Sequence, residues 1–194
     1  MTDFGPKVTL NNPAFIHPTA LLYGKVTVEE GASLWPYVVA RAENYEIKIG
    51  KNTNIQDFVM LHVGYDTPTI IGENCSITHH CTIHGCTIGN NTLVGINSTI
   101  MDGCVIGDNC IIGGHTFLKD GTVIPDNSIV IGTPGEVKKT VNSYVANRMN
   151  AELYLRNAKH YAEGNHDAWE GEEFAMELLS KMGDIQGDMK KLYG

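Results

Sequence analysis

Three histidines and two cysteines lie within the eleven residues from Ser76 to Cys86, SITHHCTIHGC. Imidazole nitrogens and thiolate sulfurs are ligands that zinc ions prefer in proteins, so the segment suggests a metal site. It holds more potential ligands than one ion needs. Which of these side chains can meet depends on the elements that carry them, and those elements follow from the rest of the sequence.

The chain carries a six-residue repeat in which an aliphatic residue is followed, four places later, by a small one; IGENCS, ITHHCT and IGDNCI are clear examples. Its eighteen units begin at residues 16, 22, 28, 34, 40, 49, 55, 61, 71, 77, 83, 88, 94, 100, 106, 112, 118 and 124. Each unit predicts a short strand and a tight corner, and stacked units form a solenoid with coils about 4.8 Å apart. Asn and Gly in GEN, GNN and GDN suit corners of positive φ.

The repeat also accounts for most of the cysteines. Cys75, Cys81, Cys104 and Cys110 occupy the fifth place of their units, where other units carry Thr or Ser. We therefore predict that they are small core residues and not metal ligands or disulfide partners. Cys86 falls in a unit that is one residue short, and its role stays open at this point.

Composition narrows the class of protein. The formal net charge of −8 argues against nucleic acid as a partner, because nucleic-acid binding normally requires a basic face. The sequence contains no run of about 18 apolar residues and does not begin like a signal peptide. We therefore expect a cytoplasmic protein with no membrane partner and with a small-molecule substrate.

The repeat stops after Thr133-Pro134-Gly135. A cap at Asn142 or Ser143 would begin a helix that runs to about Gly164, and a second helical stretch interrupted by glycines follows. The predicted organisation is a β-solenoid over residues 12–137. A C-terminal helical segment over residues 138–194 is expected to pack on the solenoid or on a neighbouring subunit.

Counting positions on the coils separates the histidines. His62 and His84 take the second place of the middle unit in consecutive coils, so they are expected to stack on one face, above Arg41. His79 takes the third place of a first unit and should lie on another face. A single chain cannot easily bring the three together, but a three-fold assembly can. We predict a metal site with His62 and His84 from one subunit and His79 from the next.

Three imidazoles with an open position are typical of catalytic zinc, although Fe²⁺ and Co²⁺ also accept them. The alternative is that the three histidines are exposed polar residues that bind no metal. The remaining histidines are expected to be bystanders or surface residues: His17, His80, His115, His160 and His166.

With these positions established, the sequence resembles the γ-class carbonic anhydrase-like family of hexapeptide-repeat proteins, from about Pro13 to the helix near Tyr161. The resemblance is carried by ARAENYEIKIGKNTNIQDFVMLH, HHCTIHGCTIG and GTVIPDNSIVIGTPGEV. A His after NIQDxxxL, and a second His five residues before the one in HGC, match the family pattern. The resemblance implies a left-handed parallel β-helix of about six triangular coils followed by one or more α-helices. It also implies a homotrimer.

The resemblance implies roles for five further residues. Arg41 would pair with Asp57 across the subunit boundary, although this pair can equally be purely structural. Asn54 and Gln56 would hydrogen-bond the metal-bound hydroxide or bicarbonate. Tyr154 matches an aromatic residue near the family's active site.

The implied activity is zinc-dependent carbonic anhydrase, a lyase that hydrates CO₂ reversibly to bicarbonate. Low activity is expected, because the loop VGYDTPT has only Asp66 as a proton-shuttle acid. Glu43 stands where the family usually has Asp, a change of one carbon that is compatible with the same ion pair. Three other functions stay open: an acyl-CoA thioester hydrolase, a hexapeptide acyltransferase that uses coenzyme A, and a non-catalytic assembly subunit. Acyltransferases of this type usually need one catalytic His and not a triplet.

Overall fold

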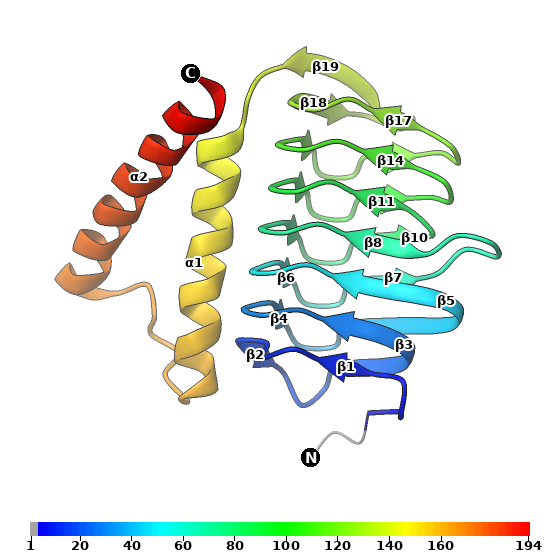
Figure 1. Ribbon diagram of the computed structural model, residues 1–194, viewed down its shortest axis with the longest axis horizontal. Helices are drawn as coiled ribbons and strands as arrows, with labels where there is room; N and C mark the ends of the chain where they lie inside the picture. Colours follow the sequence, from blue (N-terminus) through cyan, green and yellow to red (C-terminus); the bar gives the residue numbers. More distant parts are fainter. Residues whose placement is uncertain (1–3) are drawn as a thin grey trace.

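The chain folds as a stack of parallel coils with two helices along one side (Figure 1). This computed structural model describes residues 4–194. The predicted fold, a parallel β-helix followed by C-terminal helices, is confirmed. The coils present three faces to the outside, and successive strands on each face pair in parallel register.

The strands group by face. The first face holds β2 (Phe15–Ile16), β4 (Ser33–Leu34), β6 (Asn54–Ile55), β9 (Ser76–Ile77), β12 (Leu93–Val94), β15 (Ile111–Ile112), β18 (Ser128–Ile131) and the antiparallel β19 (Glu136–Thr140). The second face holds the first parts of β3 (Leu21–Val28) and β5 (Val39–Ile49), then β7 (Met60–His62), β10 (Thr82–His84), β13 (Thr99–Ile100) and β16 (Phe117–Leu118). The third face holds β1 (Thr9–Leu10), the second parts of β3 and β5, β8 (Thr69–Ile71), β11 (Thr87–Ile88), β14 (Val105–Ile106) and β17 (Val123–Ile124).

The aliphatic residue of each unit points into the solenoid and is excluded from water. Ile77, Ile83 and Ile88, one from each face of the same coil, are almost completely buried. Burying a side chain of this size stabilises the fold by roughly 1.5–3 kcal/mol. The core is therefore a continuous column of aliphatic side chains, as the repeat predicts.

All five cysteines are free and buried. This confirms the prediction for the four in fifth places and shows that Cys86 is also a core residue. Burial raises the pKa of Cys75 to about 12 and that of Cys81 to about 11. Because the thiolate is the reactive form, burial disfavours these thiols as nucleophiles or metal ligands.

The corners differ in a way that the repeat did not predict. Between the third and first faces, positive φ falls on asparagines and on Gly31, and between the second and third faces it falls on glycines. Between the first and second faces it falls on Tyr37, Phe58, His80, Asn97 and His115. The expectation that Gly and Asn fill the corners therefore holds for Asn97 at this corner but is wrong for the other four residues. A left-handed conformation costs about 1–2 kcal/mol for a residue with a Cβ atom, and Gly or Asn relieves much of that cost.

Helix α1 (Tyr144–Ala162) lies along the first face and covers the asparagine corner (Figure 1). Asn147 Nδ2 donates to the carbonyls of Asn91 and Cys110, at 2.9 Å each. Of the two predicted caps, Ser143 occupies the N-cap position but makes no side-chain cap bond. Asn142, one residue earlier, accepts from the N–H of Tyr144 through Oδ1 at 2.9 Å.

Helix α2 (Gly171–Tyr193) packs on the outside of α1, where Arg156 Nε donates to Glu177 at 2.7 Å (Figure 1). Strand β19 crosses the predicted boundary at residue 137, and the division into two segments stays a prediction. No helix within residues 4–194 has both the length and the hydropathy to cross a membrane.

Candidate functional site

His62 and His84 lie side by side on the second face. They end strands β7 and β10 and are register partners in adjacent coils. Their ring centroids are 4.8 Å apart, and His62 Nδ1 lies 2.9 Å from His84 Nε2. Thr69 Oγ1 donates to the carbonyl of His62 and accepts from the N–H of Gly85, which fixes the ends of both strands.

Each of these two imidazoles is also held by a carboxylate on its outer nitrogen. His84 Nδ1 hydrogen-bonds Asp102, and His62 Nε2 lies 3.0 Å from Glu43 Oε2. Glu43 in turn pairs with Arg41. The second face therefore carries an unbroken polar network that runs from Asp102 through the two histidines to Arg41.

The hydrogen count in this network matters for its chemistry. One hydrogen bond to each carboxylate and one between the two rings require three N–H hydrogens. Two neutral imidazoles carry only two, so one of the rings must be cationic. Burial, together with nearby Arg41 and His84, lowers the pKa of His62 and opposes that charge. A cation between the facing nitrogens would remove the conflict, because each neutral ring would then donate its outer N–H to its own carboxylate.

The donor set therefore fits a divalent metal, but one chain does not complete it. Two nitrogens bound to one tetrahedral zinc ion lie about 3.3 Å apart, close to the 2.9 Å between His62 and His84. Within residues 4–194 of a single chain, no three His, Cys, Asp or Glu side chains converge on one point in a way that could hold an ion.

Asp102 was missed by the sequence reasoning. It occupies the third place of the unit that begins at Ile100, one coil beyond His84 and one position further along the same face. The repeat count alone is enough to place Asp102 beside His84 on the second face. Asp residues at the corners, however, look like ordinary turn residues, as Asp108 and Asp126 are.

His79 lies on the first face and does not reach the pair within the chain. Its Nδ1 is 3.0 Å from Asp57 Oδ2, and both side chains are about one-third exposed. Burial, and then the charge of Asp57, raises the pKa of Tyr154 on α1 to about 12. His79, Asp57 and Tyr154 thus form a separate group beside α1.

Asn54 and Gln56 are buried on the first face. Gln56 Nε2 donates to Asn54 Oδ1 at 2.9 Å, and Asn54 Nδ2 donates to Ser76 Oγ at 2.9 Å. Ser76 Oγ donates to Asn150 Oδ1 on α1 at 2.7 Å. In the single chain these amides connect the solenoid to α1 and do not lie beside His62 and His84.

The predicted site residues therefore fall into two groups, one on each side of a corner. Arg41, His62 and His84 lie on the second face, and the first face holds Asn54, Gln56, Asp57, His79 and, from α1, Tyr154. Arg41 pairs with Glu43 and Asp57 with His79, so the chain alone does not form the predicted Arg41–Asp57 pair. That pair across subunits stays a prediction.

With the geometry established, three comparisons place the chain among known proteins. Residues 85–120 match the family described as bacterial transferase hexapeptide (six repeats). This match agrees with the six-residue repeat in the sequence and with the solenoid fold. Residues 85–120 therefore carry the repeat of that family, and the parallel solenoid is the fold expected for it.

The carnitine operon protein CaiE of Escherichia coli (strain SMS-3-5 / SECEC) is 44% identical to this chain over 89 residues, 46% of the chain and 45% of CaiE. CaiE of Escherichia fergusonii matches equally well. The chain thus spans about half the length of the curated relatives it matches. Of what the resemblance implies, the hexapeptide repeat and the parallel β-solenoid are confirmed.

Two solved structures match most of the chain. A hexapeptide transferase family protein of Anaplasma phagocytophilum is 29% identical with a TM-score of 0.76, over 79% of this chain and 92% of that one. A protein of Bacillus cereus named "putative acetyltransferase" is 27% identical with a TM-score of 0.65, over 77% and 91%.

The prediction of a zinc-dependent carbonic anhydrase, a lyase, is contradicted by these comparisons. The similar proteins are named for a carnitine operon, for hexapeptide transferases and for acetyltransferases. They agree better with the alternative of an acyl-CoA thioester hydrolase or a hexapeptide acyltransferase-type protein. The comparisons give no support to zinc either, so the ligand set His62, His79 and His84 stays a prediction.

Proposed function

We propose that this hexapeptide-repeat protein is an acyl-transfer enzyme that acts on a thioester of coenzyme A at the second-face network. The observation that carries the proposal is the hydrogen bond from His84 Nδ1 to Asp102. A carboxylate on one imidazole nitrogen fixes the tautomer and leaves the other nitrogen, Nε2, as a base. This is the relation between a general base and the group that orients it.

His84 Nε2 would take the proton from the attacking nucleophile. In the chain it lies against His62 Nδ1, so the nucleophile would bind at the position where the two nitrogens face each other. As the new bond forms between the nucleophile and the acyl carbon, the bond from that carbon to the sulfur of coenzyme A breaks. The proton held by His84 then passes to the departing thiolate, so that coenzyme A leaves as a thiol.

The other residues of the network would hold His84 and its substrate in place. Glu43 orients His62 through Nε2, and Arg41 offers its guanidinium to an anionic part of the substrate. The names of the similar structures support acyl transfer as the reaction class. The acyl acceptor would be water in a hydrolase and a small alcohol or amine in a transferase. Release of coenzyme A with and without added acceptors distinguishes the two.

The predicted metal and trimer would change the role of His84, because an ion bound to Nε2 takes the lone pair that otherwise accepts the proton. We propose that His62 and His84 of one copy and His79 of another would hold a divalent ion, as a homotrimer permits. When bound, a zinc, iron or cobalt ion would act as a Lewis acid toward the acyl carbonyl. The orienting roles of Asp102, Glu43 and Asp57 are the same with or without the ion.

Incubation of the purified protein with a panel of acyl-CoA thioesters is expected to release coenzyme A, measured as free thiol. The panel would run from acetyl-CoA to longer acyl chains, each with and without added alcohol and amine acceptors. Release that needs no acceptor identifies a hydrolase, and release that depends on one identifies a transferase. No release from any thioester under either condition would contradict the proposed function.

The metal content of His79→Ala is a separate test of the shared site. Wild-type protein is expected to hold one ion per chain. The variant should lose it while keeping the same oligomeric state, because two imidazoles of one copy bind an ion much more weakly than three. Elemental analysis after gel filtration measures both, with His160→Ala on α1 as the control. Full metal occupancy in His79→Ala would refute the shared site.

A further inference from the structure

A buried hydroxyl lies beside the carboxylate that orients His84. Thr67 belongs to the loop between β7 and β8, and its Oγ1 is shielded from solvent. Within residues 4–194, that oxygen makes no hydrogen bond. Buried polar groups are normally paired, because an unpaired one costs the free energy of removing it from water. A hydroxyl that the fold buries without a partner therefore points to a use outside the packing of the solenoid.

Two glycines show where this hydroxyl lies. A Cβ atom placed on Gly85 would be 2.5 Å from Thr67 Oγ1 and would also lie against Asp102 Oδ1. A Cβ atom placed on Gly64 would be 2.9 Å from Asp102 Oδ1 and would also lie against Thr67 Oγ1. The two oxygens therefore face the same small space, which stays open because neither glycine carries a side chain.

The backbone of the loop holds Thr67 at this position. The N–H of Gly64 donates to the carbonyl of Thr67 at 2.9 Å, which closes a tight turn. Two residues further on, Thr69 Oγ1 bonds the carbonyl of His62 and the N–H of Gly85. These contacts hold the loop against the ends of β7 and β10, so the hydroxyl is a fixed part of the corner that carries the histidine pair.

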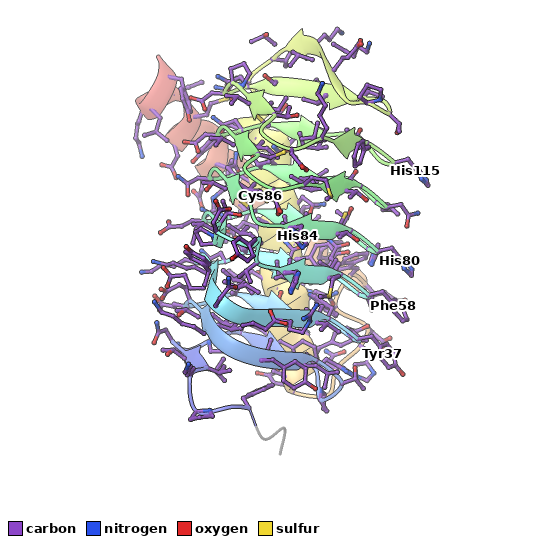
Figure 2. The ribbon with its side chains drawn as sticks, turned by 90° about the vertical axis from the view of Figure 1, so that its right-hand side faces the viewer. Tyr37, Phe58, His80, His84, Cys86 and His115 are labelled. Atoms are coloured by element: carbon purple, nitrogen blue, oxygen red, sulfur yellow. The ribbon has the colours of Figure 1, made fainter. Side chains whose placement is uncertain are left out.

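The carboxylate that faces this hydroxyl has only one partner on that oxygen. Asp102 Oδ1 hydrogen-bonds His84 Nδ1, and the Asp102 side chain is 38% exposed. Figure 2 labels His84 and Cys86, which lie on either side of Gly85 in the middle of the stack. A carboxylate this open to water can turn toward solvent. Its oxygen accepts more than one hydrogen bond, and a threonine hydroxyl rotates to meet an acceptor.

We propose that Thr67 is a positioning residue, whose hydroxyl donates to Asp102 Oδ1 and holds that carboxylate toward His84 Nδ1. Because both oxygens face the same space, a small movement of either side chain brings them to hydrogen-bond distance. A hydrogen bond to an ionised acceptor is among the stronger ones in proteins. The inference rests on the proposed acyl transfer, in which Thr67 acts through Asp102 on His84 and does not touch the substrate.

Two substitutions of Thr67 separate this role from a purely structural one. Thr67→Val replaces the hydroxyl by a methyl group of similar size. It is expected to lower kcat for acyl-CoA cleavage roughly tenfold with KM nearly unchanged, while the urea concentration at the midpoint of unfolding stays equal or rises. Thr67→Ser keeps the hydroxyl and should retain most of the wild-type kcat without a gain in stability. A structural role alone would make activity follow stability in both variants.

The matched control is Thr116→Val. Thr116 Oγ1 is also buried and unpaired within the described part of the chain, but it takes no part in the network of His62 and His84. This variant should leave kcat unchanged. If Thr67→Val does not fold, Thr67→Ala, which also lacks the hydroxyl, is measured in the same way. An unchanged kcat in the folded Thr67 variant would overturn the inference while leaving acyl transfer at His84 intact.

A measurement without substrate tests the contact separately from the reaction. The hydrogen on His84 Nδ1 is followed by NMR. Its exchange with solvent should be severalfold faster in Thr67→Val than in the wild type, because the carboxylate that protects it can turn away. Thr116→Val should exchange as the wild type does. Equal rates in the wild type and Thr67→Val would overturn the role of Thr67. A difference in exchange in a protein that cleaves no thioester would contradict the proposed function and support the contact between Thr67 and Asp102.

Discussion

Replacement of His84 by Gln is expected to lower kcat for acyl-CoA cleavage by roughly 10²–10⁴-fold, with a small change in KM. Gln has a similar reach, and its amide can still donate to Asp102. It cannot take a proton from the nucleophile or return one to the leaving thiolate. Steady-state release of coenzyme A, followed as free thiol, measures the loss. An unchanged rate in a folded His84→Gln protein would exclude His84 as the general base.

The position of Asp102 allows a matched variant that separates orientation from base chemistry. Asp102→Asn keeps the size of the side chain, but its amide can hold the imidazole of His84 in the wrong tautomer. The loss should be smaller than in His84→Gln, and the double variant should lose no more than His84→Gln alone. His160→Gln, at the end of α1 and away from the network, is the control and should keep the wild-type rate. Additive losses would show that Asp102 acts independently of His84.

The six-residue repeat predicted the features that follow from the backbone path, namely which residues point inward and which lie in neighbouring coils. It placed Ile77, Ile83 and Cys81 inside the solenoid and set His62 and His84 in neighbouring coils, because each position on a coil recurs at the same place on the next. The same count could have found Asp102 beside His84. A carboxylate at a corner, however, has the same sequence signature as a turn residue such as Asp108 or Asp126.

The sequence could not predict the contacts that form when α1 packs against the solenoid. Asn54 and Gln56 occur in a family motif, but only the position of α1 shows that they form a buried network with Ser76 and Asn150. Phe58 at a positive φ is also beyond a rule that assigns corners to Gly and Asn. The function inferred from resemblance failed for a related reason. The similar proteins are named for a hexapeptide transferase family and for a carnitine operon, so the repeat and the fold alone do not decide the reaction.

Replacement of Gly85 by Ala is expected to impair both stability and acyl transfer, because this residue packs against the group that orients His84. Gly85 has a φ of 51°, and a Cβ there would lie against the Asp102 carboxylate, 2.5 Å from Thr67 Oγ1 and 2.8 Å from the Gly64 nitrogen. The backbone must shift, and with it the partner of His84 Nδ1. We expect a loss of unfolding free energy of about 2–3 kcal/mol, measured by urea denaturation, and at least a tenfold lower kcat.

The glycine corner supplies its own control for this prediction. Gly121 lies at the same corner with a φ of 70°, and a Cβ there would meet no atom within 4 Å. Gly121→Ala should therefore lose only about 1 kcal/mol from backbone strain, with kcat unchanged. The difference between the two variants isolates the contact with Asp102 from the strain that they share. Equal losses of kcat in both would mean that Gly85 contributes to the corner alone, and that the Asp102 carboxylate can move without effect on His84.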